Sequence, residues 1–214
     1  SLYEDLGGLV WLGTCGNGLL KFNDNARRFG PGLRKMPSIR AIFKTSDGRV
    51  WLSQMTSGLY FMDPLTQQPV LAHKNLLFFK NDFGNALCFH EDKNGALWVG
   101  GHISGLFKIT DWQSGRQPKF EQIPIETKLE WNSNYCPSKI IEDPSGMFWM
   151  VSPDALRRFD PRSKAVEKFP FFDENDLGAQ NRNQFPTVFQ DHRGRIWIGM
   201  GGSGLWLFDV EKKS

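Results

Sequence analysis

The side chains that could do acid–base or metal chemistry in this chain are few and scattered. The histidines are His73, His90, His102 and His192. The cysteines are Cys15, Cys88 and Cys136. No His-x-x-x-His pair or comparable ligand spacing predicts a metal site, and an odd number of cysteines without paired spacing predicts no disulfide framework. As a general base, His102 is the candidate, with Asp154 or Glu130 as partners.

Amide, arginine and aromatic side chains gather in stretches that lie between apolar segments. Trp131, Asn132 and Tyr135 form one such group, and Arg182 with Asn183 forms another. Planar amides and guanidinium groups hydrogen-bond hydroxyls, and aromatic rings stack on apolar faces, so both groups suit a sugar. Arg34 could meet an acidic ligand. The alternative interpretation is that these are ordinary polar loops.

The elements that must position these loops are five copies of one repeat. In each copy a glycine lies three residues before a tryptophan and an apolar residue directly precedes it. The five segments are Asp5-Leu-Gly-Gly-Leu-Val-Trp11, Thr45-Ser-Asp-Gly-Arg-Val-Trp51, Asp92-Lys-Asn-Gly-Ala-Leu-Trp98, Asp143-Pro-Ser-Gly-Met-Phe-Trp149 and Asp191-His-Arg-Gly-Arg-Ile-Trp197. A Gly-Leu pair follows seven residues after the tryptophan in four copies, and the fourth copy has Ala155-Leu156 instead. The tryptophans recur roughly every 40–50 residues, the length of a propeller blade.

The third copy shows how one repeat becomes an antiparallel sheet. Residues 86–90 and 97–100 read as strands joined by the turn Asp92–Gly95, in which Asp bonds the backbone and Gly accepts positive φ. Residues 105–109 and 119–123 read as the third and fourth strands. A sheet with two apolar faces needs neighbours on both sides, so the tryptophans are predicted to fill the space between sheets.

We therefore predict an all-β protein, a β-propeller of five four-stranded antiparallel repeats. Their approximate boundaries are 1–36, 37–84, 85–134, 135–183 and 184–214. Residues 210–214 are few and charged, which makes a fourth strand in the last copy doubtful. Two arrangements fit, a five-bladed ring or a segment of a larger, seven-bladed ring. The start inside a first strand favours the segment, whose uncovered sheet faces would tend to associate.

Loops between the second and third strands, and loops between repeats, would together form the mouth of a central channel. Because function resides in such loops, this mouth is the predicted ligand site. The predicted ligand-binding residues are Arg34, Gln54, His102, Trp131, Asn132, Tyr135, Arg182 and Asn183. No metal or other cofactor is expected.

Charge and hydropathy exclude some classes of protein. The net charge of +3 is too small to indicate nucleic acid binding. No apolar run reaches the ~18 residues of a membrane span, and no signal peptide is evident.

The segments Asp-x-x-Gly-x-Val/Leu/Ile-Trp, with the Gly-Leu that follows, resemble the propeller repeats of two-component regulators. The match is best in copies one, three and five, at Trp11-Leu12-Gly13, Trp98-Val99-Gly100 and Trp197-Ile198-Gly199. Ser53 and Val151 depart from it in the other two copies. The resemblance implies the periplasmic sensor half of a membrane receptor whose output half is a histidine kinase or a nucleotide cyclase. It also implies a glycan as one class of ligand.

Together these observations predict a sensor module that binds an oligosaccharide or similar small ligand and has no catalysis of its own. A homodimer, through the propeller or through the rest of the receptor, is compatible with this role. One alternative is an enzyme of the streptogramin-lyase type, a propeller with similar Gly-x-x-Trp repeats, which would need a metal and a base such as His102. The other is a scaffold for protein contacts or dimerisation.

Overall fold

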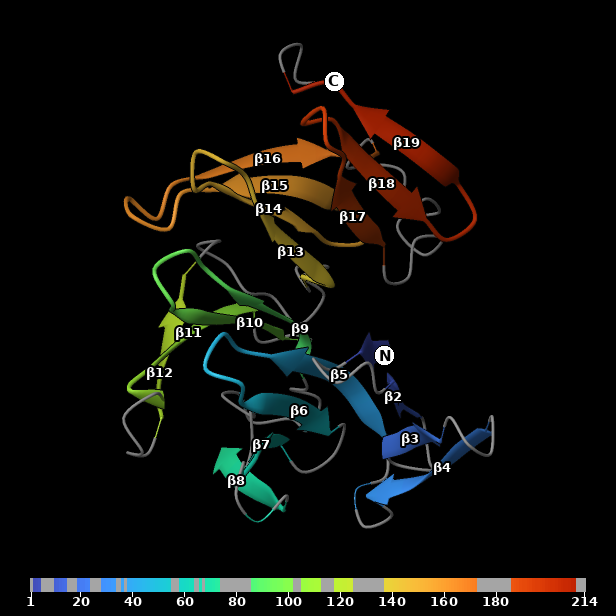
Figure 1. Ribbon diagram of the computed structural model, residues 1–214. Helices are drawn as coiled ribbons and strands as arrows, with labels where there is room; N and C mark the ends of the chain where they lie inside the picture. Colours follow the sequence, from blue (N-terminus) through green and yellow to red (C-terminus); the bar gives the residue numbers. More distant parts are fainter. Residues whose placement is uncertain are drawn as a thin grey trace.

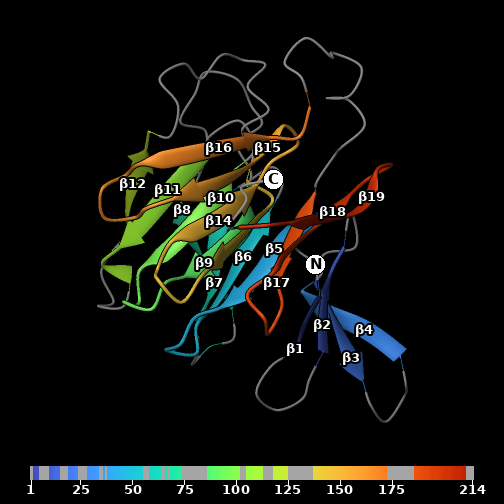
Figure 2. The same cartoon turned by 90° about the horizontal axis from the view of Figure 1, so that it is seen from above.

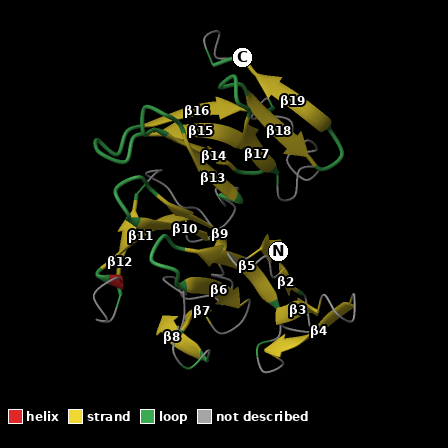
Figure 3. Ribbon diagram, in the orientation of Figure 1, coloured by secondary structure: helices red, strands yellow, loops and turns green. Residues whose placement is uncertain are grey.

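The computed structural model is built almost wholly of β-strands (Figure 3). The residues that it describes are 2–4, 10–14, 19–23, 28–33, 36, 38–54, 58–63, 66, 68–73, 86–101, 105–112, 118–124, 137–172 and 186–210. These residues form five separate antiparallel sheets in which each strand pairs with the next along the chain.

The strands are grouped in chain order, one sheet after another. The first two sheets contain β1 (Leu2–Glu4), β2 (Val10–Gly13), β3 (Leu19–Asn23) and β4 (Arg28–Leu33), then β5 (Ile39–Lys44), β6 (Val50–Gln54), β7 (Gly58–Met62) and β8 (Pro69–His73). The third and fourth contain β9 (Ala86–Glu91), β10 (Leu97–Gly101), β11 (Gly105–Thr110) and β12 (Lys119–Ile123), then β13 (Lys139–Glu142), β14 (Phe148–Val151), β15 (Ala155–Phe159) and β16 (Val166–Pro170). The fifth contains β17 (Thr187–Gln190), β18 (Ile196–Met200) and β19 (Gly204–Phe208).

The five sheets follow one another as an arc around a common centre, with the first strand of each sheet innermost (Figures 1 and 2). Inner strands of successive sheets contact one another, as β5 contacts β9, β9 contacts β13 and β13 contacts β17. The all-β, propeller-like arrangement is therefore as predicted. The prediction of five four-stranded repeats is wrong in its last member, because the described residues form four complete four-stranded sheets and a fifth with three strands.

The turn between the first and second strands is built as its sequence predicts. In the third sheet, Oδ1 of Asp92 accepts the backbone N–H groups of Asn94 and Ala96, each at 2.9 Å. Gly95 has φ of 76°, a left-handed conformation that glycine adopts without strain. Oδ2 of the same carboxylate accepts the indole N–H of Trp98. One aspartate thus closes the turn and fixes the tryptophan six residues later.

The core lies between the sheets rather than within one centre, because both faces of a propeller sheet are apolar. The tryptophans of the first four sheets pack towards the following sheet. Trp98 contacts Phe148 and Phe159 of the fourth sheet, at ring-centroid distances of 5.1 and 5.8 Å. Trp149 contacts Phe208 of the fifth sheet at 5.6 Å. Stacked sheets bury each other's apolar faces, so each one depends on its neighbour for stability.

Candidate functional site

The inner strands surround a cavity of about 510 Å³ at the centre of the arc. Its lining comes from β1, β5, β9 and β13 and the residue before β13, and most of the lining side chains are apolar. Each inner strand begins on the side of its sheet where a loop connects the second and third strands. It ends on the opposite side, at the Asp-x-x-Gly turn. The beginnings of the inner strands therefore mark the end of the cavity where the predicted channel mouth lies.

Two cationic side chains line this end of the cavity. Arg40 and Lys139 lie at the starts of β5 and β13, and both are exposed. Arg40 lies at a β-bulge, since the pairing of β5 with β6 shifts between Ile39 and Ala41. The pairing of β9 with β10 shifts at the corresponding place, beside Leu87. A bulge redirects the side chain of the extra residue, and here Arg40 and Leu87 are both brought to the cavity wall.

Buried polar atoms without partners lie at the ends of the neighbouring second strands. Among the described residues, Ser53 Oγ, Gln54 Oε1 and Ser152 Oγ have no hydrogen-bond partner. The pairing of Gln54 with Ile39 places it one residue from Arg40 on the adjoining strand. Buried polar groups are nearly always paired, so these three atoms, among the five unpaired ones of the described residues, are consistent with a place where polar contacts form on binding.

Asp154, which the sequence offers as a partner for a catalytic base, is fully engaged in ion pairs. Its carboxylate binds Arg157 at 2.9 and 2.7 Å, and Lys168 lies 3.2 Å away. Burial alone would raise the pKa of Asp154, but the hydrogen bond and charge of Arg157, with that of Lys168, outweigh it and lower the pKa. An ionised carboxylate held by two cations neutralises the fully buried Arg157 and makes a poor proton donor.

At the other end of the cavity, His90 and Glu142 join the third and fourth sheets. The His90 Nε2 lies 3.3 Å from the Glu142 carboxylate, and the His90 ring packs edge-on against Phe148. Burial lowers the pKa of His90, and the nearby Glu142 only partly offsets this. The thiol of Cys88 donates to the carbonyl oxygen of Pro137, and burial raises its pKa to about 12. Both groups are structural links between sheets, and the Cys88 thiol is unreactive.

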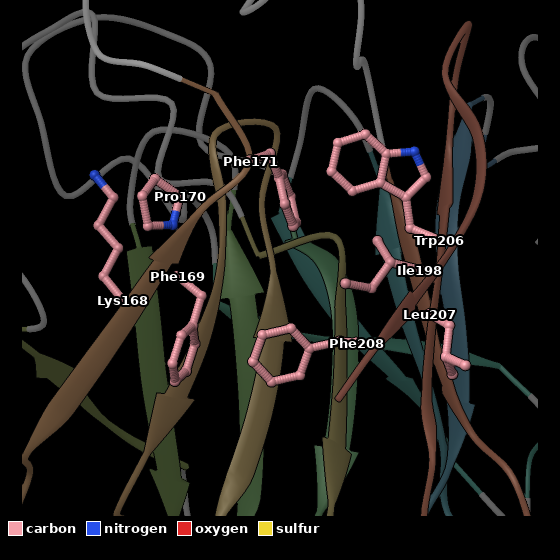
Figure 4. Close-up of a pocket in the computed structure, with 8 residues that line it drawn as sticks. All are labelled: Lys168, Phe169, Pro170, Phe171, Ile198, Trp206, Leu207 and Phe208. Carbon is pink, nitrogen blue, oxygen red and sulfur yellow. The ribbon is translucent and has the colours of Figure 1, made fainter. Parts of the chain in front are cut away.

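A second, smaller hollow of about 210 Å³ lies between the outer strands of the fourth and fifth sheets. Figure 4 shows Phe171 and Trp206 near one end of it, with Phe169 and Phe208 farther along. The Trp206 ring lies 6.1 Å from the Phe171 ring, and its indole N–H donates to the carbonyl of Ser203. Lys168 is the one charged residue lining this hollow. The central cavity offers more polar groups and is the better candidate for a specific site.

Of the predicted ligand-binding residues, the structure describes one. Gln54 ends β6 near the channel mouth but is buried, with 6% of its surface exposed. The others lie outside the described residues: Arg34, His102, Trp131, Asn132, Tyr135, Arg182 and Asn183. Arg40 and Lys139 were missed because they sit within strands. Aligning the strands that precede each Asp-x-x-Gly turn could have found them, since both precede the tryptophan by ten or eleven residues.

The described part of the chain contains no group of three or more His, Cys, Asp or Glu residues able to hold a metal ion. Nor do the described residues include a helix that is long and apolar enough to cross a membrane.

Comparison with known proteins relates the fold to extracellular domains of two-component systems. No protein-family model and no curated protein matches the sequence. Among solved structures, two extracellular domains from Bacteroides thetaiotaomicron, described as belonging to the hybrid two-component systems BT4673 and BT3049, are similar. Their TM-scores are 0.69 and 0.68, with 22% and 15% sequence identity. The alignments cover 100% and 99% of this chain but only 29% and 27% of those chains.

The same fold also occurs in an enzyme. A gluconolactonase from Xanthomonas campestris has a TM-score of 0.65 at 13% identity, with 97% of this chain and 70% of that one covered. The chain thus has the all-β propeller fold of extracellular domains of two-component systems, and it spans less than a third of their length.

Proposed function

We propose that this chain is part of the extracytoplasmic sensor propeller of a two-component-type receptor and that it binds a glycan at the mouth of the central channel. The observation that supports this most is the fold, which matches extracellular domains of such systems over essentially the whole chain. In this role the chain has no catalysis of its own, is located in the periplasm, and acts through an output domain elsewhere in the receptor. A homodimer of the receptor would be compatible with this.

The chemistry of the cavity favours a glycan that carries a negative charge. Arg40 and Lys139 place two cations at one end, whereas the lining carboxylate, Glu142, lies at the opposite end beside His90. Guanidinium and ammonium groups bind carboxylate or sulfate groups through charge-assisted hydrogen bonds. The predicted loop residues, Trp131, Asn132, Tyr135, Arg182, Asn183, Arg34 and His102, would contribute stacking and hydroxyl contacts around this charged end.

The enzyme alternative draws on the gluconolactonase fold and on a base at His102. The engagement of Asp154 with Arg157 and Lys168 counts against it, because the candidate partner carboxylate is held by cations.

A thermal-shift screen with uronic-acid or sulfated oligosaccharides, their neutral counterparts and divalent metal ions tests the proposal. Ligand binding raises the melting temperature, so we expect a rise with acidic glycans that exceeds the rise with neutral ones. Lys139→Glu should weaken binding about tenfold or more, because it replaces an attraction with a repulsion. Arg193→Glu, the same charge change in an exposed turn at the far end, is the matched control.

Several results would contradict the proposal. A response to metal ions alone that is abolished by His102→Ala would favour the enzyme. No response to any glycan would favour a scaffold. An equal loss of binding in Lys139→Glu and Arg193→Glu would show that the charge effect is not local to the cavity.

A further inference from the structure

The leucine of the Gly-Leu pair lies on the same face of its sheet as the tryptophan. Its exposed fraction therefore shows whether a neighbouring sheet covers that face. Its counterparts in the first four sheets are buried, with exposed fractions of 3% for Leu19 and 0% for Leu59, Leu106 and Leu156. In the fifth sheet the same position, Leu205, is 67% exposed. One face of the fifth sheet therefore lacks, among the described residues, the cover that every other sheet has.

This uncovered face consists of one row of aligned residues and Leu205. Phe189 pairs with Trp197, and Trp197 pairs with Leu207, across the three strands. Phe189 is 63% exposed and Leu207 is 49% exposed. The opposite face, with Ile196, Ile198 and Phe208, is buried against the fourth sheet. We call the row Phe189–Trp197–Leu207 with Leu205 the Trp197 face.

Neighbouring sheets also meet through a repeated polar contact beside the tryptophan. At two of the four interfaces, the residue before the turn aspartate of one sheet binds the turn of the preceding sheet. Glu91 accepts the backbone N–H of Ser46 at 2.6 Å, and Glu142 accepts that of Lys93 at 3.0 Å. Ser46 and Lys93 occupy the same position, directly after the first residue of the turn. The contact is a carboxylate supplied by the covering sheet to a backbone N–H of the covered one.

Two interfaces lack the carboxylate. Between the first and second sheets the corresponding residue is Lys44. In the fourth sheet the corresponding turn residue is Pro144, which has no backbone N–H to donate. The covering fifth sheet has Gln190 in place of the glutamate, and its side chain donates to the carbonyl of Gly194 within its own turn. At this interface the backbone donor and the carboxylate are both absent.

The turn of the fifth sheet has the donor. His192 follows Asp191 and is exposed, and no partner for its backbone N–H occurs among the described residues. The adjoining Arg193 is also exposed and cationic. The Trp197 face thus combines an uncovered aromatic surface with a backbone N–H at the turn position that Glu91 and Glu142 engage in the second and third sheets.

From this we infer that the Trp197 face is a docking surface for another sheet of this repeat type, one that carries a carboxylate at the end of its inner strand and binds the N–H of His192. This interface would continue the series of interfaces between successive sheets. Its partner is defined by an apolar face that packs on Trp197 and by the carboxylate.

An extended chain tests this inference directly. Phe159-Asp160 and Phe208-Asp209 end equivalent strands, so a second copy of residues 161–209 can follow Asp209 at an equivalent junction. The copy supplies a fourth strand for the fifth sheet and then a sixth sheet. At the position of the sixth sheet that corresponds to Gln190, one version keeps glutamine and the other carries the change Gln190→Glu. We expect the Glu version to melt about 3–6 °C higher than the Gln version, because a charged acceptor then meets the His192 N–H.

His192→Pro provides the matched control. Proline is accommodated at this turn position in the fourth sheet, as Pro144. In the extended chain it should abolish the difference between the Glu and Gln versions, because the donor is gone. If the difference persists with His192→Pro, the carboxylate acts elsewhere and the inference is overturned.

A measurement on the unextended chain guards against failure of the extension to fold. Leu205→Glu should leave its melting temperature within about 2 °C, whereas Leu156→Glu should lower it strongly because Leu156 is buried. A strong loss from Leu205→Glu would contradict the inference, since the face would already be covered. Two other results would overturn the inference. One is hydrogen exchange in which the added sheet of the extended chain is unprotected while the five original sheets are folded. The other is self-association of the chain that protects Trp197.

Discussion

The carboxylate of Asp92 accepts a hydrogen bond from the indole Nε1 of Trp98, six residues later, at 2.8 Å. The same relationship joins Asp143 to Trp149 at 3.1 Å and Asp191 to Trp197 at 3.0 Å. The six-residue spacing in the sequence therefore has a structural cause. It places the aspartate at the start of the turn within hydrogen-bonding reach of the tryptophan indole on the second strand. One carboxylate thus stabilises both the local turn and the position of the tryptophan that packs between sheets.

Replacing Asp92 with alanine should destabilise the protein by about 3 kcal/mol, because two turn N–H groups lose their acceptor and a buried indole N–H is left unpaired. Urea denaturation of the variant measures this. Glu121, in the same sheet as Asp92, forms an exposed ion pair with Lys164. Glu121→Ala removes this carboxylate and should change stability by less than about 1 kcal/mol. Equal effects of the two changes would show that the Trp98 contact contributes little.

The second sheet lacks this contact and can be given it. Thr45 stands in place of the aspartate, and Trp51 Nε1 is buried without a partner among the described residues. Thr45→Asp with Asp47→Ser reproduces the arrangement of Asp143 and Ser145 while removing a neighbouring like charge. We expect stabilisation by about 1 kcal/mol, measured as a melting temperature about 2–4 °C higher. Adding Trp51→Phe should remove the gain, and a gain that survives this change would have another cause.

Gly100 allows a close approach between the third and fourth sheets. A Cβ there would lie 2.6 Å from the Cys88 Sγ and 2.7 Å from the Pro137 carbonyl oxygen. Gly100→Ala should therefore cost about 2–3 kcal/mol in denaturant unfolding, since the Pro137 backbone cannot move without shifting the interface. At the equivalent Gly199, a Cβ would meet only the Thr187 side chain at 3.0 Å, so Gly199→Ala should cost less. Equal losses would contradict this account.

His90 should make stability depend on pH in the mildly acidic range. Burial lowers its pKa below the ordinary 6.5, with Glu142 opposing the shift, so the unfolded chain binds a proton more readily than the folded one. The free energy of unfolding should thus be highest above pH 6.5 and fall as the pH drops from 6.5 towards the lowered pKa. Below about pH 4, the lowered pKa values of Asp143 and Asp154 add a separate loss.

Melting temperatures recorded between pH 5 and 8 check this, with His90→Gln as the test and His192→Gln, in an exposed turn, as the control. The slope should flatten in the first variant and persist in the second. A slope unchanged by His90→Gln would assign the effect to other groups.

The local structure was predictable because its causes lie within a few residues. The turn Asp92–Gly95 and the strands at 97–100, 105–109 and 119–123 follow from side chains that bond their own backbone and from apolar residues of strand length, and the structure confirms them. The tryptophans were predicted to fill the space between sheets, and Trp98 and Trp149 do so. The predicted channel-mouth residues apart from Gln54 fall outside the described residues and remain predictions.

What the amino-acid sequence by itself determined is the repeat: the turn, the strand order within each sheet and the ring that must be covered, since these depend on contacts between near neighbours in the chain. The tertiary structure alone decided which side chains share the central cavity and which face has no cover among the described residues. Arg40 and Lys139 are almost a hundred residues apart, and only the stacking of successive sheets around one axis brings them to a common wall. The exposure of Leu205 likewise depends on the presence of a neighbouring sheet, a relation that its own Gly-Leu pair does not encode.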